Sequence, residues 1–293
     1  MIRTALKWAE FVKLSHTVFA MPFALASMLV AARENRGWPG WRLFGLIMAA
    51  LVCARTCAMA FNRIVDRKFD AVNPRTSMRH LPAGSIPLPG AIALCLLSGG
   101  GLIAVSWFIN PVCFYLSPVA LLIICFYSLT KRFTAYTHVY LGVALALAPI
   151  GAWLAVRNSL HVLPIVLALA VVFWLIGFDI IYATQDYEFD REHGLHSLVV
   201  RYGIKNALGL AFLSHLAMWA LLFAFGLLAR FRLAYLVGLL MILACLLLEH
   251  WLAHKRNLKW LNVAFFRMNA LISIVFLICT AVEVVFPGFR IVR

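Results

Sequence analysis

Two short acidic clusters stand out in a chain that is otherwise rich in apolar residues. The first covers residues 62–70, and the second covers residues 179–190. Each cluster closes a long apolar run, and a carboxylate near hydrocarbon costs about 2.5 to 3.5 kcal/mol on insertion scales. Carboxylates that are concentrated at membrane depth in spite of this cost predict a functional site.

The spacing within the clusters indicates which chemistry such a site could perform. Polar residues four apart form two ladders, which are Asn62, Asp66 and Asp70 and then Tyr182, Asp186 and Asp190. In a helix this spacing places side chains on one face, a turn apart. Oxygen ligands so arranged suit Mg²⁺, which keeps several waters and takes one or two carboxylates together with phosphate oxygens. The clusters therefore predict a diphosphate held through Mg²⁺. Neither a P-loop nor a G-x-G-x-x-G motif is present, which argues against a nucleotide.

The apolar runs define the elements that must position these residues. Apolar residues make up 64% of the 293 residues and charged residues only 13%, which excludes a soluble surface. Stretches long enough to cross a hydrocarbon core of about 30 Å lie near 16–33, 41–61, 88–109, 111–129, 135–155, 162–184, 206–229, 231–252 and 263–286. The sequence predicts an all-α polytopic membrane protein of about nine transmembrane helices, bundled around a central cavity open to the cytoplasmic side. No linker divides the chain, so we expect one domain over residues 1–293.

The distribution of basic residues predicts the orientation in the membrane. With the N-terminus in the cytoplasm, 17 Lys and Arg residues fall on the cytoplasmic side, 8 fall on the other side, and Arg55, which lies well inside a predicted span, is counted on neither side. The positive-inside rule then places both acidic clusters at the cytoplasmic face of the cell inner membrane. Because the charges are not gathered on one soluble element, the net charge of +15 does not indicate a nucleic-acid partner. The expected partners are the bilayer and small substrates, with no obligate protein partner.

The motifs resemble those of the UbiA superfamily of intramembrane prenyltransferases. The residues that carry the resemblance are Asn62-x-x-x-Asp66-x-x-x-Asp70, Pro74-Arg75, Asp179-x-x-Tyr182-x-x-x-Asp186-x-x-x-Asp190 and Gly194-x-x-Ser197. The resemblance covers essentially the whole chain, including the number of helices. It implies that a polyprenyl chain is transferred from polyprenyl diphosphate to an aromatic ring, with Mg²⁺ as cofactor.

The resemblance also implies roles for individual residues. The residues expected to hold the Mg²⁺-diphosphate are Asn62, Asp66, Asp70, Asp186 and Asp190. Arg75 and Lys131, the latter within Tyr127-Ser128-Leu129-Thr130-Lys131-Arg132, are expected to bind diphosphate oxygens.

The aromatic acceptor is less well specified than the diphosphate site. The chain looks like the branch of 4-hydroxybenzoate polyprenyltransferases, which act in ubiquinone and menaquinone biosynthesis. That branch typically carries Asp-Lys-Pro early in the first helix and Gly-x-Lys-Ser after the second motif, but this chain has Ser15-His16-Thr17 and Gly194-Leu195-His196-Ser197. The alternative acceptor is 1,4-dihydroxy-6-naphthoate of the futalosine route to menaquinone. Both acceptors are carboxylated phenols.

Arg55 is the candidate for recognising the carboxylate of the acceptor. It lies seven residues before Asn62, on the same helical face, and a guanidinium binds a carboxylate in bidentate fashion. The alternative is a structural ion pair or a contact with a carbonyl group. A matching Arg at this spacing in hydroxybenzoate enzymes supports the first interpretation.

Two residues are candidates for handling the ring proton. Asp179 and Tyr182 lie on the helical face of Asp186, where either one could orient the phenol or accept the proton that leaves the ring.

A different class of function, an ion-coupled transporter, would also use paired acidic residues. Transporter carboxylates usually lie in the middle of a span, whereas these close their helices beside basic loops, which favours a diphosphate pocket.

Overall fold

The computed structural model describes residues 2–13, 17–254 and 258–286, and the regular secondary structure within these ranges is entirely helical. The helices are α1 (Ile2–Phe11), α2 (Thr17–Ala31), α3 (Trp41–Val72), α4 (Leu88–Ile109), α5 (Pro111–Thr130), α6 (Thr137–Arg157), α7 (Val162–Ala183), α8 (Tyr187–Glu192), α9 (Leu198–Leu228), α10 (Leu233–His254) and α11 (Leu258–Val285). Two short 3₁₀ helices are η2 (Arg33–Asn35) and η3 (Thr184–Asp186). The predicted all-α class is confirmed.

The predicted spans correspond to helices of the structure. In the described ranges, 8 helices are long and apolar enough to cross a membrane, and the shorter apolar helix α2 occupies the first predicted span. Helices α3 and α9 extend furthest beyond the predicted bounds. Helix α3 continues through the whole first acidic cluster, and α9 begins at Leu198, with a kink where Gly203 takes a φ of 76°. The expectation of about nine helices agrees with this arrangement.

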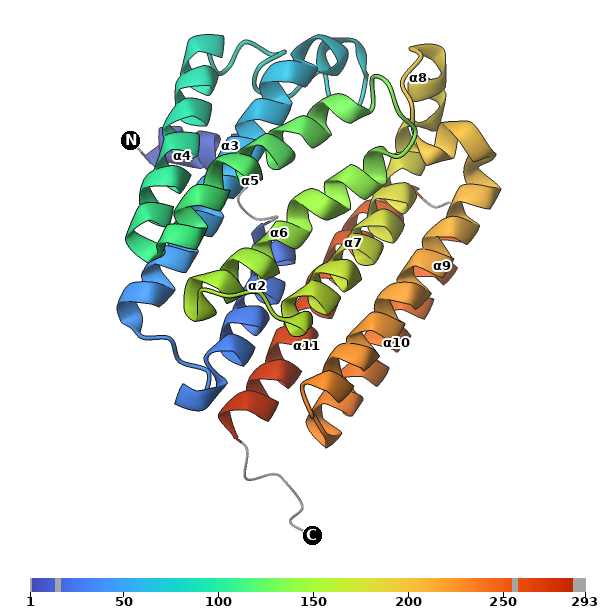
Figure 1. Ribbon diagram of the computed structural model, residues 1–293. Coiled ribbons are helices and arrows are strands. Elements are labelled where there is room, and N and C mark those ends of the chain that lie inside the picture. The colour runs from blue at the N-terminus through green and yellow to red at the C-terminus, as the bar shows by residue number, and fades with distance from the viewer. Residues whose placement is uncertain (1, 14–16, 255–257, 287–293) are drawn as a thin grey trace.

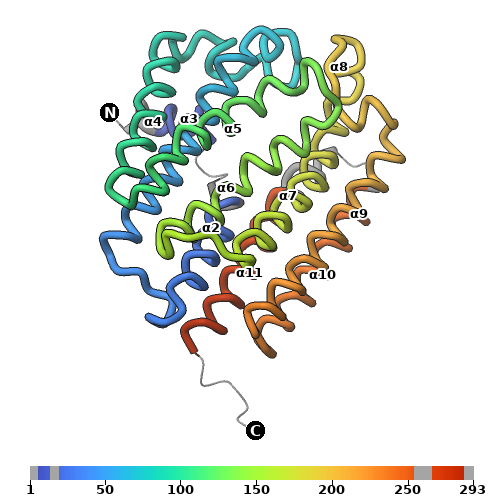
Figure 2. The backbone as a smooth tube through the Cα atoms, in the orientation of Figure 1, coloured from blue at the N-terminus to red at the C-terminus, as the bar shows by residue number. Residues whose placement is uncertain are grey.

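Helix α6 lies between two groups of helices (Figure 1 and Figure 2). Helices α3, α4 and α5 pack together on one side of it, and α7, α9, α10 and α11 form the other side. Helix α2 packs against α6 and α11. The loop between α3 and α4 and the short helix α8 lie at the same end of the bundle. This arrangement brings the two acidic clusters to one end of the protein.

Apolar side chains lie both on the outer surface of the helices and inside the bundle. Leu96 and Leu97 on α4 are 70% and 76% exposed, as expected for side chains that face lipid. Inside the bundle, Phe23, Trp174 and Phe276 are almost completely buried. The Phe23 ring centroid lies 5.0 Å from both the Trp174 and the Phe276 centroids, a contact distance typical of aromatic pairs. This aromatic contact joins α2, α7 and α11.

A close helix crossing positions α6 against α7. A Cβ atom at Gly142 would lie 2.8 Å from the carbonyl oxygen of Val172 and 3.0 Å from its Cα, so only glycine fits there. His138 stands one turn before Gly142 on α6, and Asp179 stands two turns after Val172 on α7. The crossing at Gly142 therefore helps to set the distance between these two polar side chains.

We expect Gly142→Ala to destabilise the protein by about 1 to 3 kcal/mol, because the added methyl group would push against the α7 backbone. The measurement is thermal unfolding of the purified protein in detergent. Gly151→Ala, on the same helix, is the matched control, since no atom lies within 4 Å of the added Cβ. Equal melting temperatures for the two variants would contradict this account of the crossing.

Candidate active site

A cavity of about 660 Å³ lies at the end of the bundle that carries the acidic clusters. Its lining comes from α1, α3, α5, α6, α7, η3 and α8, from the segments that follow α1, α3 and α8, and from Phe266 of α11. The lining includes every site residue predicted from the sequence, namely Arg55, Asn62, Asp66, Asp70, Arg75, Lys131, Asp179, Tyr182, Asp186 and Asp190. The tertiary structure thus brings the ten residues to one cavity, whereas their individual roles stay predictions.

Asp66 is buried and paired with a cation from another helix. Its side chain is 4% exposed, and Lys131 Nζ at the end of α5 lies 2.8 Å from Oδ2. Asn62 Nδ2 donates to the same oxygen at 3.2 Å, as the four-residue spacing on α3 predicts. Arg132 NH2 lies 3.5 Å from the other oxygen. Lys131 and Asp66 therefore form a unit, in which a basic side chain stands at the rim of the cavity beside a carboxylate.

Asp70 is held by two arginines that sequence reasoning did not assign to the site. Arg79 NH1, from the loop after α3, lies 2.7 Å from Oδ1, and Arg63 NH1 lies 3.9 Å from Oδ2. Thr76 Oγ1 donates to the backbone carbonyl of Asp70 at 3.1 Å. These contacts fold the loop back over the end of α3. The basic residues of the loop were visible in the sequence, but their partner was not.

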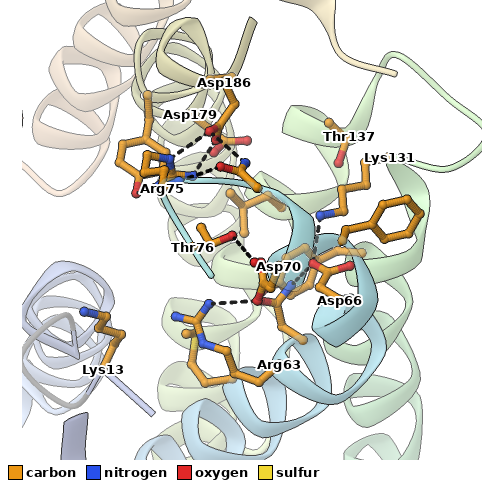
Figure 3. Close-up of a pocket in the computed structure, with 18 of the residues that line it drawn as sticks. Lys13, Arg63, Asp66, Asp70, Arg75, Thr76, Lys131, Thr137, Asp179 and Asp186 are labelled. Carbon is orange, nitrogen blue, oxygen red and sulfur yellow. Dashed lines mark hydrogen bonds and ion pairs between the residues drawn. The ribbon is translucent and has the colours of Figure 1, made fainter. Parts of the chain in front are cut away.

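Arg75 joins the two acidic clusters. It extends from the loop after α3 to Asp186, to which it donates from Nε at 2.7 Å and from NH2 at 2.5 Å (Figure 3). Its NH1 donates to the Tyr182 hydroxyl at 2.7 Å. Burial alone lowers the pKa of Arg75, but the hydrogen bonds and the negative charge of Asp186 raise it above its usual value. A fixed cation therefore stands between the clusters.

The second acidic ladder is interrupted by a 3₁₀ turn, so Tyr182, Asp186 and Asp190 do not follow one regular α-helix as the sequence predicts. Helix α7 ends at Ala183, η3 carries Asp186, and the six-residue helix α8 carries Asp190. A 3₁₀ turn winds more tightly than an α-helix, so side chains four apart no longer lie above one another. The first ladder, by contrast, lies entirely within α3.

Asp179 has a partner that the sequence did not indicate. His138 of α6 is 1% exposed, and its Nδ1 lies 2.7 Å from Asp179 Oδ2. The Asp179 side chain is 23% exposed and lines the cavity. Figure 3 shows Asp186 beside Arg75, apart from Asp66 and Asp70. A single histidine within an apolar run carries no sequence signal that would pair it with a residue 41 positions away.

Arg55 lies deeper in the bundle than the acidic clusters. It is seven residues before Asn62 on α3, or about 10 Å along the helix axis. Its Nε is buried and has no hydrogen-bond partner within the described residues. Arg55 also lines a second cavity of about 200 Å³, whose walls are mainly Ala, Leu and Ile side chains of α3 to α6. The expected alternative, a structural ion pair, has no acidic partner in the described part of the chain.

The donor set suits a metal that is shared with a phosphate ligand. Within the described residues, no group of three or more His, Cys, Asp or Glu side chains is placed to hold a metal ion. Mg²⁺ requires only one or two carboxylates when phosphate oxygens and waters supply the rest. Asp70 lines the cavity, and its Oδ2 accepts no hydrogen bond within the described residues, although Arg63 NH1 lies 3.9 Å away, so this oxygen retains capacity for such a ligand. The residues present therefore fit Mg²⁺ together with a diphosphate.

Two segments, 15–17 and 194–197, depart from the hydroxybenzoate pattern. In the first segment, Ser15 and His16 lie outside the described residues. In the other segment, the His196 backbone N–H donates to the Lys131 carbonyl at 2.8 Å, and Ser197 Oγ caps α9 by accepting from Val200 N at 3.1 Å. This segment thus packs directly against the residue that pairs with Asp66.

Comparison with known proteins identifies the family of the chain. A model of the UbiA prenyltransferase family matches residues 20–271. A 4-hydroxybenzoate octaprenyltransferase of Tolumonas auensis is 31% identical over 235 residues, which make up 80% of this chain and 82% of that protein. A protein of the same name from Herminiimonas arsenicoxydans is 29% identical over 245 residues, or 82% of this chain and 84% of the relative. The chain belongs to the UbiA prenyltransferase family and is an enzyme of the prenyltransferase class.

Solved structures share the fold. A UbiA homologue from Aeropyrum pernix K1, in its apo form, has a TM-score of 0.82 at 28% identity, over 92% of this chain and 98% of the homologue. A UbiA homologue from Archaeoglobus fulgidus, bound to GPP and Mg²⁺, has a TM-score of 0.73 at 22% identity, over 95% of this chain and 99% of that chain. Both cover nearly the full length of the helical bundle.

Proposed function

We propose that this enzyme transfers a polyprenyl group from polyprenyl diphosphate to the ring of a carboxylated phenol, with Mg²⁺ as cofactor. The supporting observation is the layout of one cavity, which has acidic and basic pairs at its rim and the unpartnered Nε of Arg55 in its depth. The relatives named 4-hydroxybenzoate octaprenyltransferase favour 4-hydroxybenzoate as the acceptor. The alternative within the same chemistry is 1,4-dihydroxy-6-naphthoate.

The rim of the cavity suits the leaving group. Ionisation of an allylic diphosphate builds negative charge on its phosphate oxygens, and Arg75 and Lys131 present fixed positive charge there. Asp66, Asp70, Asp186 and Asp190, with Asn62, would hold Mg²⁺, which neutralises the developing charge when it is bound with the diphosphate. The basic side chains and their carboxylate partners already stand at the rim, so both can exchange partners with the diphosphate and its metal ion when these arrive.

The depth of the cavity suits the allylic group. Leu141, Leu145, Trp174 and Phe178 line it alongside the charged residues. Trp174 precedes Asp179 by five residues on α7, about 7.5 Å further from the rim. Apolar walls exclude water, and aromatic faces stabilise positive charge, so an allylic cation formed there would be protected until the ring attacks.

Loss of one carboxylate from each cluster should abolish most turnover. We expect Asp66→Asn and Asp186→Asn to lower kcat by about 100-fold or more even in excess Mg²⁺, comparable with removal of one transition-state donor in other enzymes. The assay is transfer of a labelled polyprenyl group by purified enzyme, with and without chelator. Glu188→Gln is the control, because Glu188 is exposed and its ion pair within the described residues is with Arg191 at the surface. Full activity in a strong chelator would refute the metal requirement.

The role of Arg55 can be separated from that of the leaving-group residues. Removing one half of a desolvated ion pair costs about 3 to 5 kcal/mol, so Arg55→Ala should raise the KM for the aromatic acid by about 100-fold or more. The KM for polyprenyl diphosphate should stay nearly unchanged. Arg42→Ala, at the exposed start of the same helix, is the control. A loss of affinity for the diphosphate alone would assign Arg55 to the leaving-group site. Titrating each candidate acid in the same assay identifies the acceptor.

We also propose that the cavity faces the cytoplasm of a bacterial cell, as the distribution of basic residues favours. Met78 in the loop after α3 is 85% exposed, and Ser159 lies in the exposed loop at the other end of α6. An impermeant thiol reagent should label Met78→Cys only after lysis and should label Ser159→Cys in intact spheroplasts. The parent protein measures background from the native cysteines. The reverse pattern would invert the proposed orientation.

A further inference from the structure

His138 and Asp179 form a buried dyad beside the cavity. The imidazole Nδ1 lies 2.7 Å from Asp179 Oδ2, and His138 itself is 1% exposed. Asp179 makes no other hydrogen bond within the described residues, and it lines the cavity with a side chain that is 23% exposed. One carboxylate oxygen is therefore held by the histidine, while the other is left for a ligand in the cavity.

The surrounding backbone fixes the tautomer of His138. The N–H of Leu198, in the first turn of α9, points at His138 Nε2 at 3.4 Å. A backbone N–H can only donate, so Nε2 must accept and carries no proton. The proton of the neutral ring then resides on Nδ1 and is donated to Asp179. Three helices thus take part in orienting one carboxylate, since His138 lies on α6, Asp179 on α7 and Leu198 on α9.

We infer that His138 is a positioning residue, which holds Asp179 as the base that receives the ring proton. This inference rests on the proposed transfer to an aromatic acceptor. The allylic C–O bond breaks and the diphosphate leaves with the electron pair, and then a ring carbon forms the new C–C bond. The ring C–H bond returns its electrons to the aromatic system while its proton passes to Asp179 Oδ1. The resulting carboxylic acid later releases that proton to water.

The alternative base, Tyr182, is less suited to this role. Its hydroxyl oxygen accepts a hydrogen bond from Arg75 NH1 at 2.7 Å, and the Arg75 guanidinium lies 5.2 Å from the ring centroid. A phenol must also lose its own proton before it can accept another, whereas an aspartate is ionised at neutral pH. The geometry therefore separates the two candidates. Tyr182 belongs with Arg75 at the leaving-group side, and Asp179 belongs with His138.

The test uses an acceptor deuterated at the ring position that is prenylated. In the unaltered enzyme, a well-placed base removes the proton quickly, so deuteration should hardly change kcat. In His138→Leu the orientation of Asp179 is lost, kcat should fall by about tenfold, and a deuterium isotope effect on kcat should emerge. The KM for polyprenyl diphosphate should not change. His138→Asn keeps an amide N–H near the Nδ1 position and should restore both kcat and the small isotope effect.

Other outcomes would overturn the inference. If His138→Leu lowers kcat but leaves the isotope effect as in the unaltered enzyme, His138 has only a structural role. If the leucine variant does not fold, His138→Ala with added imidazole replaces it, and failure of imidazole to reverse a raised isotope effect overturns the inference. Absence of ring prenylation by the unaltered enzyme would instead refute the proposed function, which keeps the two failures distinct.

Discussion

Charged groups beside hydrocarbon must be balanced, and in this protein the carboxylates and their cations come from different elements. Asp66 pairs with Lys131 at the end of α5, and Asp186 pairs with Arg75 from the loop after α3. Leaving one member of such a pair alone in a buried site costs about 3 to 5 kcal/mol. The pairs therefore do two things. They make the acidic clusters tolerable in the folded bundle, and they fasten the α3–α4 loop and the end of α5 over the cavity.

The same pairing prepares the enzyme for a highly charged substrate. A diphosphate with Mg²⁺ carries both signs of charge, and a rim that already holds both signs can exchange partners with it without first exposing a bare charge to the apolar interior. Deeper in the cavity the lining includes leucine, tryptophan and phenylalanine side chains, and Arg55 supplies a basic group there. In the proposed function, the rim and the depth of the cavity therefore have different roles. The leaving group belongs at the rim, while the allylic group and the acceptor carboxylate belong in the depth.

Rigid helix packing is what makes a small group such as His138 effective. The α6–α7 crossing at Gly142 leaves no room for a side chain between the two backbones, which helps to set the separation of His138 from Asp179. A base that must face a ring carbon benefits from such a fixed frame, because proton transfer needs correct geometry as well as a suitable acidity.

The sequence by itself determined the class of the protein and most of its site. Apolar runs of membrane-spanning length require helices, since backbone groups in lipid must be satisfied within the segment. The first ladder could be predicted in detail because Asn62, Asp66 and Asp70 lie on one helix, where local periodicity fixes the geometry. The tertiary structure alone decided three other matters, which are the break of the second ladder at η3, the reach of Arg75 to Asp186, and the pairing of His138 with Asp179. The first depends on how α7 ends against its neighbours. The other two join residues 111 and 41 positions apart, whose meeting depends on loop closure and helix crossing and leaves no periodic trace in the sequence.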